Sequence, residues 1–195
     1  MQKVKSSHSK RADIRQTHKC LRAQMSSDEV RQKSRYICEK LVEEPWYQEC
    51  DIIYGYYPLG NEVDCRSLLE QALAEGKRVA LPRMAEQCHM DFYEITFLEQ
   101  VAEGGFHVME PIEACPMMQE QQAVVLVPGV VFDPSGNRYG YGKGYYDRYF
   151  ERFPELYKVA LAYENQMEQE LEVLDTDVKM DSVCTEEQIH RIKIG

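Results

Sequence analysis

Apolar residues in this chain gather in short runs, and the segments between the runs have the spacing of amphipathic helices. Five runs are expected to form strands: 51–57, 78–81, 92–95, 123–127 and 157–163. Four segments are expected to form helices: 9–25, 26–44, one from 64 or 67 to about 76, and one from about 145 to 153. Because strands and helices alternate, the pattern predicts an α/β protein, a three-layer α/β/α single domain (residues 1–195) with a mostly parallel sheet.

Local signals mark the ends of these helices. Ser26 and Glu29 have the spacing of a capping box, so the second helix is expected to begin there. Pro45 is expected to stop that helix, because proline has no backbone N–H to continue it. Gly76 suits the left-handed residue that commonly follows a helix, and is expected to close the third one.

The helix predicted within residues 1–25 carries two stripes. Ile14, Leu21 and Met25 give it an apolar stripe, by which it is expected to pack on the domain. The second stripe is cationic and consists of Arg11, Arg15, Lys19 and Arg22. Two interpretations of the cationic stripe stay open: a binding surface for an anion, or a solvated helix face.

The charge of the chain is unevenly distributed. The net charge is −10, but residues 1–24 carry +6 and the remaining residues therefore carry −16. A body so acidic repels nucleic acid, which we exclude as a partner. No apolar run approaches the roughly 20 residues of a membrane-spanning helix, and no membrane association is expected. We expect a monomer.

The cysteine pattern favours reduced thiols in a cytoplasmic protein. Seven cysteines are present, an odd number, and no two of them have the C-x-x-C spacing. This pattern suits neither a disulfide framework nor a structural zinc site.

The candidate chemistry lies in residues 128–147, which hold five of the eleven glycines. The segment follows a buried strand and precedes a helix, where open α/β sheets bind their ligands. Alternating glycines let backbone N–H groups approach phosphate oxygens, and Arg138 and Lys143 add positive charge. The spacing is neither that of a Walker A loop nor that of a dinucleotide-binding fingerprint. A glycine-rich structural turn is the alternative interpretation.

The same segment resembles the signature of a known family, the 5-formyltetrahydrofolate cyclo-ligases (5,10-methenyltetrahydrofolate synthetases). The motif is Gly140-Tyr141-Gly142-Lys143-Gly144-Tyr145-Tyr146-Asp147, preceded by Pro128-Gly129 and Phe132-Asp133. Other segments resemble the family in the same order: Arg11 with Ile14-Arg15, Tyr57 with Glu62-Val63-Asp64, residues 160–166, and Asp177-Val178 with Met180-Asp181. The resemblance covers nearly the whole chain.

The resemblance implies a ligase that closes a ring with the help of ATP. The formyl oxygen of 5-formyltetrahydrofolate attacks the γ-phosphate, N10 attacks the activated carbon, and phosphate leaves. The products are 5,10-methenyltetrahydrofolate, ADP and phosphate. Such a reaction needs positioning and charge neutralisation more than a protein nucleophile. Mg²⁺ is the implied cofactor.

The resemblance also implies the residues of the site. The catalytic residues would be Lys143 and Arg138. ATP would be bound by Arg11, Ala12, Asp13, Ile14, Arg15, Arg138, Tyr139, Gly140, Tyr141, Gly142, Lys143, Gly144, Tyr145 and Tyr146. The folate would be bound by Tyr57, Glu62, Tyr141, Gly142, Lys143, Gly144 and Tyr145. Mg²⁺ would be held by Asp147 and Asp181.

Plainer alternatives accompany these assignments. Asp147 could stabilise the dipole of a helix whose first turn it occupies. Asp181 could cap a strand or turn, Glu62 could be a surface acid, and Tyr145 and Tyr146 could be packing residues. A different function on a related scaffold, that of a sugar-phosphate isomerase or a CoA-transferase, also stays open, because a fold does not fix a function.

Overall fold

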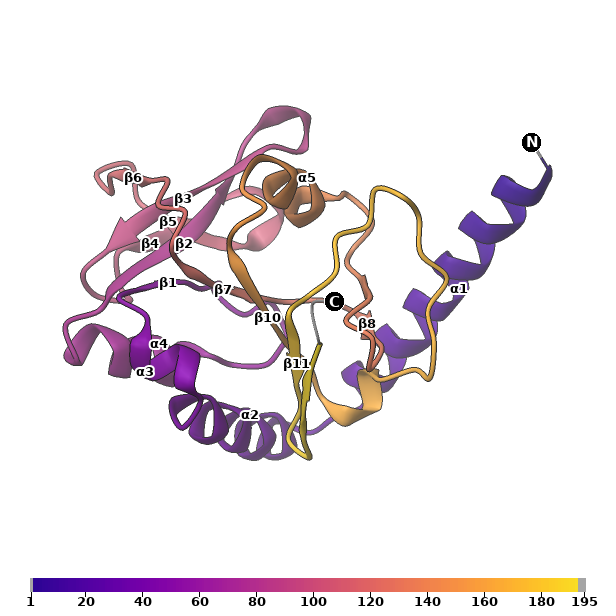
Figure 1. The fold of residues 1–195 in the computed structure, drawn as a ribbon, viewed down its shortest axis with the longest axis horizontal. Coiled ribbons are helices and arrows are strands. Elements are labelled where there is room, and N and C mark those ends of the chain that lie inside the picture. The colour runs from indigo at the N-terminus through magenta and orange to yellow at the C-terminus, as the bar shows by residue number, and fades with distance from the viewer. Residues whose placement is uncertain (1, 193–195) are drawn as a thin grey trace.

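The computed structural model describes residues 2–192, and the side chains of residues 9–105 and 107–192. An eight-stranded sheet forms its centre (Figure 1). Its strands are β1 Ile52–Tyr54, β2 Arg78–Met84, β3 Met90–Ile95, β6 Met117–Met118, β7 Val124–Val127, β10 Tyr157–Leu161, β11 Ser182–Cys184 and β12 Ile189–Arg191. Their order across the sheet is β12-β11-β10-β7-β1-β2-β3-β6.

The five central strands are parallel, which confirms the expected α/β class. β11, β10, β7, β1 and β2 all run in the same direction. The edges differ: β3 and β6 continue the sheet antiparallel on one side, and β12 does so on the other. The run 92–95 is therefore part of an antiparallel edge, because only a short turn joins β2 to β3 and a parallel crossover needs a longer connection.

Residues 2–192 contain five α-helices, three short 3₁₀ turns and two small hairpins besides the sheet. The helices are α1 Gln2–Ala23, α2 Ser27–Val42, α3 Pro45–Glu49, α4 Arg66–Ala74 and α5 Tyr145–Arg152. The 3₁₀ turns are η1 Glu86–Cys88, η2 Gly105–His107 and η3 Glu164–Gln166. The hairpins pair β4 Val101–Glu103 with β5 Met109–Pro111, and β8 Val131–Phe132 with β9 Arg138–Tyr139.

The three layers follow from the alternation of side chains along the central strands. In β7, Val124 and Leu126 face a core shared with α2, α3 and α4, whereas Val125 and Val127 face the core under α5. β7 is apolar on both faces because helices cover both faces. Figure 1 shows α2, α3 and α4 on one side of the sheet and α5 on the other.

The helix ends predicted from Ser26, Pro45 and Gly76 hold to within two residues, whereas α1 begins at Gln2, seven residues before the predicted start. Ser26 caps α2: its hydroxyl accepts from the backbone N–H of Glu29, and the Glu29 carboxylate accepts from the Ser26 N–H. Gly76 has a φ of 83°, as a residue after a helix end requires. Pro45 follows the end of α2 and opens α3. The Trp46 ring of α3 packs 6.3 Å from that of Tyr157, at the start of β10.

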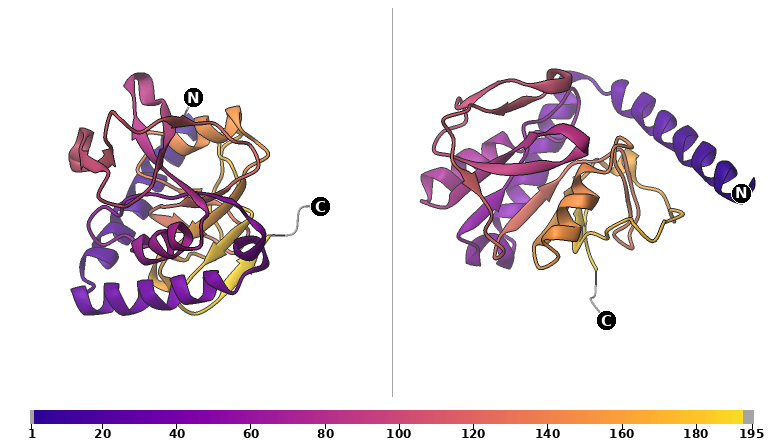
Figure 2. Two further views of the ribbon diagram at one scale, coloured as in Figure 1. Left: turned by 90° about the vertical axis from the view of Figure 1, so that its left-hand side faces the viewer. Right: turned by 90° about the horizontal axis from the view of Figure 1, so that it is seen from above.

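Helix α1 lies along one flank of the domain, with its amino end pointing away from it (Figures 1 and 2). Ile14 packs against a small cluster that includes Val131 and Leu171, and the buried Met25 follows the helix end. Leu21 does not join this apolar stripe, since it is 40% exposed. His18 bonds the backbone oxygen of Asn165 at 2.9 Å and so ties the helix to η3.

Within the described residues, none of the helices combines the length and the apolar character needed to span a bilayer. All seven cysteines are free thiols, and four of them are buried.

Candidate active site

A cavity of about 760 Å³ opens beyond the carboxyl ends of the central strands. Tyr57 follows β1 and Pro128 follows β7, so the cavity lies at the edge of the sheet where the sequence placed the chemistry. Most of the predicted site residues line it: Arg11, Arg15, Tyr57, Glu62, Arg138, Gly140, Tyr141, Gly142, Lys143, Gly144, Tyr145, Tyr146 and Asp147.

The other predicted residues lie around the cavity or away from it. Ala12 and Asp13 are exposed on α1, Ile14 packs beneath that helix, and Tyr139 is buried under two arginines. Asp181 lies at the opposite end of the sheet, as described below.

The glycine loop owes its shape to backbone conformations that other residues rarely adopt. Gly142 and Gly144 have φ values of 96° and 69°. Gly144 is the residue before α5, so the free N–H groups of that helix begin where the loop meets the cavity. A Cβ at Gly140 would lie only 2.6 Å from the Arg138 guanidinium, so this glycine also makes room for the arginine.

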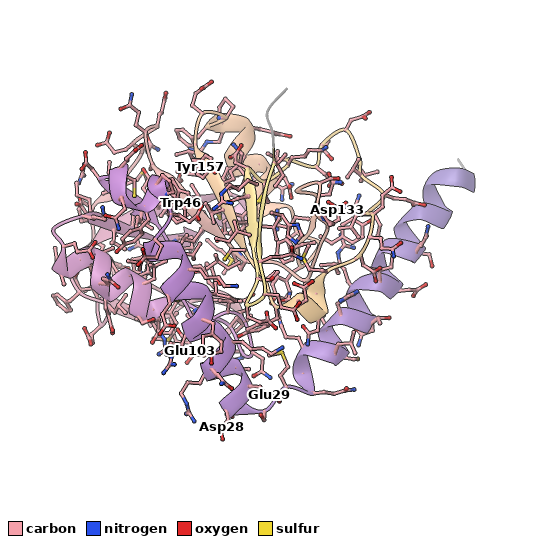
Figure 3. All side chains as sticks on the ribbon, turned by 60° about the horizontal axis from the view of Figure 1, so that its bottom comes forward. Asp28, Glu29, Trp46, Glu103, Asp133 and Tyr157 are labelled. Carbon is pink, nitrogen blue, oxygen red and sulfur yellow. The ribbon has the colours of Figure 1, made fainter. Side chains whose placement is uncertain are left out.

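A buried aspartate holds the base of the same loop. Asp133 is fully buried, and its carboxylate accepts four hydrogen bonds, of 2.7–3.0 Å, from Ser135, Asn137 and Leu171. Figure 3 shows Asp133 among the loops between the strands and α1. The Phe132-Asp133 part of the signature is thus structural: its carboxylate is saturated by groups that shape the β8–β9 hairpin.

Two arginines of α1 stack on one aromatic ring at the cavity wall. The guanidinium carbons of Arg11 and Arg15 lie 4.3 Å and 5.2 Å from the centroid of the Tyr139 ring. Arg15 Nε donates to the Gly140 oxygen at 2.9 Å, and its pKa is lowered by burial and by the charge of Arg11. Arg11 Nε and Nη1 are buried without a partner in the described part of the chain.

Two aspartates form ion pairs with arginines that line the cavity. Asp177 pairs with Arg11 at 2.9 Å, and Asp147 pairs with Arg138 at 3.3 Å. The Val178 N–H donates to Asp147 at 3.3 Å, so the segment 177–178 lies against the start of α5. Both aspartates line the cavity.

Asp181, the second predicted metal ligand, is not brought to this pair. Its carboxylate accepts from the Lys158 N–H at 2.6 Å and lies 3.2 Å from Lys158 Nζ, at the amino ends of β10 and β11. Asp177 occupies the place at the cavity that the sequence analysis gave to Asp181. The sequence analysis names Asp177 and Asp181 within one segment but assigns the metal to Asp181, which directly precedes β11. Within residues 2–192, no group of three His, Cys, Asp or Glu side chains could hold a metal by itself.

The opposite wall centres on Glu62, a buried carboxylate. Its Oε1 accepts from the Tyr141 hydroxyl at 2.6 Å, and its Oε2 accepts from the Leu59 N–H at 2.9 Å. Burial raises the pKa of Glu62, and these two hydrogen bonds oppose that rise. Tyr57, half-buried, stands beside it at the cavity edge, with Arg66 Nη1 3.4 Å from its hydroxyl.

An apolar wall completes the cavity, and the sequence analysis missed it. Pro82, Met84, Met90 and Val108 line this side. Met84 and Met90 are direct partners in the antiparallel pairing of β2 with β3. Because that pairing was not predicted, nothing in the sequence indicated that these side chains would meet at the cavity. Arg148 of α5 was missed as well, and its guanidinium donates to the Cys88 and Lys143 oxygens.

Lys143 differs from the arginines in being exposed. It lines the cavity between Gly142 and Gly144, and within the described residues its ammonium has no recorded ion pair or hydrogen bond. Its charge is therefore available to a ligand.

A second cavity, of about 430 Å³, lies between α2 and α4 and shares Tyr57 with the first. Its charges balance, since its lining includes three cations and three anions: Arg31, Arg35, Arg66, Asp64, Glu70 and Glu99. The predicted site residues, Tyr57 apart, do not gather there.

Comparisons with known proteins agree on one family. The model of the 5-formyltetrahydrofolate cyclo-ligase family matches residues 7–186. The chain is 29% identical to a probable 5-formyltetrahydrofolate cyclo-ligase of Caenorhabditis elegans (90% of this chain, 92% of the relative) and 29% identical to the 5-formyltetrahydrofolate cyclo-ligase of Mus musculus (91% and 92%). A solved structure of Aquifex aeolicus 5,10-methenyltetrahydrofolate synthetase superposes with a TM-score of 0.84 at 30% identity, covering 95% of this chain and 94% of that one.

Proposed function

The chain belongs to the 5-formyltetrahydrofolate cyclo-ligase family and is a ligase, and on this premise we propose how its cavity closes the ring of 5-formyltetrahydrofolate with ATP. The products are 5,10-methenyltetrahydrofolate, ADP and phosphate. One observation carries the assignment of parts: arginines and the glycine loop line one side of the cavity, and a buried carboxylate with tyrosines lines the other.

We assign the ATP phosphates to the side formed by α1 and the glycine loop. Arg11 and Arg15 present fixed cations there, and the start of α5 presents free N–H groups. The unpartnered nitrogens Nε and Nη1 of Arg11, and Nε of Arg138, support this assignment, because buried guanidinium groups in proteins are normally hydrogen-bonded. Tyr139 acts in this proposal as the support of the two α1 arginines rather than as a direct contact.

We assign Mg²⁺ to Asp147 and Asp177. Mg²⁺ commonly takes one or two protein carboxylates and completes its shell with phosphate oxygens and water, and two carboxylates from different segments face the phosphate side here. The donor set therefore fits the ion. When bound, Mg²⁺ neutralises charge on the phosphates during transfer. The earlier choice of Asp181 does not fit, because that carboxylate is bonded at the other end of the sheet.

We assign the pterin ring to Glu62 and its neighbours. An ionised carboxylate accepts the adjacent N–H groups of a pterin edge, and charged acceptors form the stronger hydrogen bonds. Tyr57 and Tyr145 stand at the cavity where they can flank the ring, and the apolar side of Met84 and Met90 suits the rest of the molecule.

The reaction follows from the meeting of these two sides. The formyl oxygen of the folate attacks the γ-phosphorus, and the bond to the leaving oxygen of ADP breaks. N10 then attacks the formyl carbon and loses its proton, and phosphate departs with the electron pair of the carbon–oxygen bond. Arg138, fixed by Asp147, holds the phosphoryl group, while the mobile ammonium of Lys143 follows it as it moves.

An absorbance assay tests the proposal. Methenyltetrahydrofolate formation is followed after mixing the protein with 5-formyltetrahydrofolate and Mg²⁺, with ATP and without it. We expect product with ATP only. Product that forms equally without ATP, or no product at all, would overturn the proposed function. The earlier alternative of an isomerase or CoA-transferase loses its support once the family is known.

Three accompanying expectations remain proposals. We expect a cytoplasmic enzyme, which the free thiols support. We expect a monomer, which size-exclusion chromatography with light scattering can check. We expect no nucleic-acid or membrane partner, because the chain outside residues 1–24 is strongly acidic.

A further inference from the structure

Arg22, in the last turn of α1, has a position that the proposed reaction leaves unexplained. Its side chain is buried but does not line the cavity. Nη1 donates to the Gly129 oxygen at 3.0 Å, and Nη2 donates to the Tyr141 hydroxyl at 2.6 Å. The helix end is itself held, because Asn61 Nδ2 donates to the backbone oxygens of Arg22 and Met25 at 3.2 Å. Arg22 is thus fixed between the glycine loop and the loop that carries Glu62.

The hydrogen bond from Arg22 decides where the Tyr141 proton points. A phenol has one proton to donate, and arginine can only donate. Since Arg22 donates to the Tyr141 oxygen, the Tyr141 proton is left for Glu62 Oε1, 2.6 Å away. Arg22, Tyr141 and Glu62 form a chain of donors that ends on the carboxylate.

The pKa of Glu62 depends on the same chain of hydrogen bonds. Burial raises the pKa of Glu62, whereas the Tyr141 hydroxyl, the Leu59 N–H and the charge of Arg22 lower it. Two other titratable groups are electrostatically coupled to this carboxylate: Tyr56, which follows β1, and Tyr146, in α5. Both are phenols, so the cation that favours the ionised form of Glu62 is Arg22.

We propose that Arg22 is a positioning residue for folate binding: it holds the Tyr141 hydroxyl against Glu62 and so presents Glu62 as an oriented, ionised acceptor for the pterin. The inference rests on the proposed function of the cavity. It assigns the cationic stripe of α1 two tasks, since Arg11 and Arg15 face the phosphate side and Arg22 serves the pterin side through Tyr141.

The test compares Arg22→Met, Arg22→Lys and Tyr141→Phe with a matched control, Lys19→Met. Lys19 lies 5.1 Å from the centroid of the same Tyr141 ring but has no recorded hydrogen bond to it, so its removal takes away a nearby charge without breaking the chain of donors. Steady-state rates are measured against both substrates, and binding of 5-formyltetrahydrofolate without ATP is measured by calorimetry. Thermal melting checks that each variant is folded.

We expect Arg22→Met to raise the KM and Kd for the folate roughly tenfold to a hundredfold, as loss of a charge-assisted hydrogen bond does, with the KM for ATP changed less than about threefold. Arg22→Lys is expected to recover part of the affinity. The double variant Arg22→Met/Tyr141→Phe should bind the folate no more weakly than the weaker-binding single variant, because both substitutions break the same chain of hydrogen bonds. Lys19→Met is expected to stay within about threefold of the wild type.

The pH profile supplies a readout that a packing role would not change. Removing either Arg22 or Tyr141 lets the pKa of Glu62 rise further, so the acid limb of kcat/KM for the folate should move to higher pH in both variants. An unmoved limb in Arg22→Met beside a moved limb in Tyr141→Phe, or equal increases in both KM values, would overturn the proposal.

These outcomes are separable from failure of the proposed function. A wild-type protein that forms no methenyltetrahydrofolate refutes the function, and the folate titration still tests Arg22. A wild-type protein that is active and an Arg22→Met variant that binds folate normally refute only the role of Arg22. If Arg22→Met does not fold, Arg22→Lys and Tyr141→Phe decide the question by the same two measurements.

Discussion

The two ends of the sheet both carry largely buried ion pairs, but the pairs differ in how completely their polar atoms are satisfied. At the carboxyl ends of the strands, Arg11 pairs with Asp177 and Arg138 pairs with Asp147, yet Nε of both arginines and Nη1 of Arg11 have no partner in the described part of the chain. At the amino ends, Lys158 Nζ donates to the oxygens of Pro154 and Leu156 as well as lying 3.2 Å from Asp181.

The difference separates a binding site from a structural contact. The Lys158 ammonium donates to two backbone oxygens and has the Asp181 carboxylate 3.2 Å away as its counter-ion. The arginines of the cavity are held in place but keep donors unused, an arrangement whose cost is removed when a ligand supplies the acceptors. In the proposed function, a cation paired with an aspartate therefore stabilises the fold at one end of the sheet, and two such pairs bind an anion at the other.

The strongest test removes the charge of Lys143, an exposed cavity residue with no ion pair or hydrogen bond of its side chain in the described part of the chain. We expect Lys143→Met to lower kcat roughly 10²–10³-fold, the loss that follows removal of a charged contact to the reacting group, with folate binding little changed. Lys143→Ala should behave alike, because the charge rather than the stem carries the effect. Stopped-flow and steady-state kinetics measure it. Near-normal turnover in a folded methionine variant would mean that the loop backbone binds the phosphate alone.

The second test replaces the two aspartates of the cavity, one at a time, with asparagine. We expect Asp147→Asn and Asp177→Asn each to lower kcat/KM roughly 10–100-fold at limiting Mg²⁺, with partial recovery as Mg²⁺ is raised, because an amide is a weaker ligand for a hard cation. Activity titrated against Mg²⁺ gives the answer. An Asp177→Asn variant with an unchanged Mg²⁺ requirement would remove that residue from the metal site.

The third test weakens the fixed cations. Arg15→Ala is expected to raise the KM for ATP roughly tenfold, and that for the folate by much less, since a charged hydrogen bond is lost on the phosphate side alone. Initial rates at varied ATP and folate separate the two values. Equal increases in both would place Arg15 outside the nucleotide contact.

The smallest kinetic effect is expected at the amino end. Asp181→Asn should leave kcat and the Mg²⁺ requirement within about twofold of the wild type, but should lower the free energy of unfolding by about 1–3 kcal/mol, because Lys158 then keeps a largely buried charge with no anion beside it. Urea unfolding measures the stability. A variant with normal stability and a raised Mg²⁺ requirement would restore Asp181 as a metal ligand.

The contrast between Asp177 and Asp181 also shows what the sequence could and could not predict. The capping box at Ser26, the apolar run of β7 and the glycine loop are local patterns, and each forms the structure that its spacing indicates. Which aspartate reaches the cavity depends instead on where β11 begins. Asp181 directly precedes that strand, and the amino end of a parallel strand lies opposite the ligand edge.

For the same reason, local sequence patterns could not predict contacts that depend on long-range pairing. Met84 and Met90 meet through an antiparallel register that no periodicity specifies. Arg22 was placed correctly on a cationic stripe, but its direction towards Tyr141 depends on how α1 docks on loops more than 100 positions away along the chain.

That docking has a consequence for the order in which the protein acquires its activity. Helix α1 is the first element of the described chain to be synthesised, yet its partners come last: Arg11 meets Asp177 across 166 positions, and His18 meets Glu168 across 150. Closing such long loops is slow, so the helix can form early but waits for nearly the whole chain before it docks. During translation the side of the cavity that we assign to the phosphates is therefore completed only after residue 177 has been made, and a nascent chain that ends earlier lacks the contact between Arg11 and Asp177.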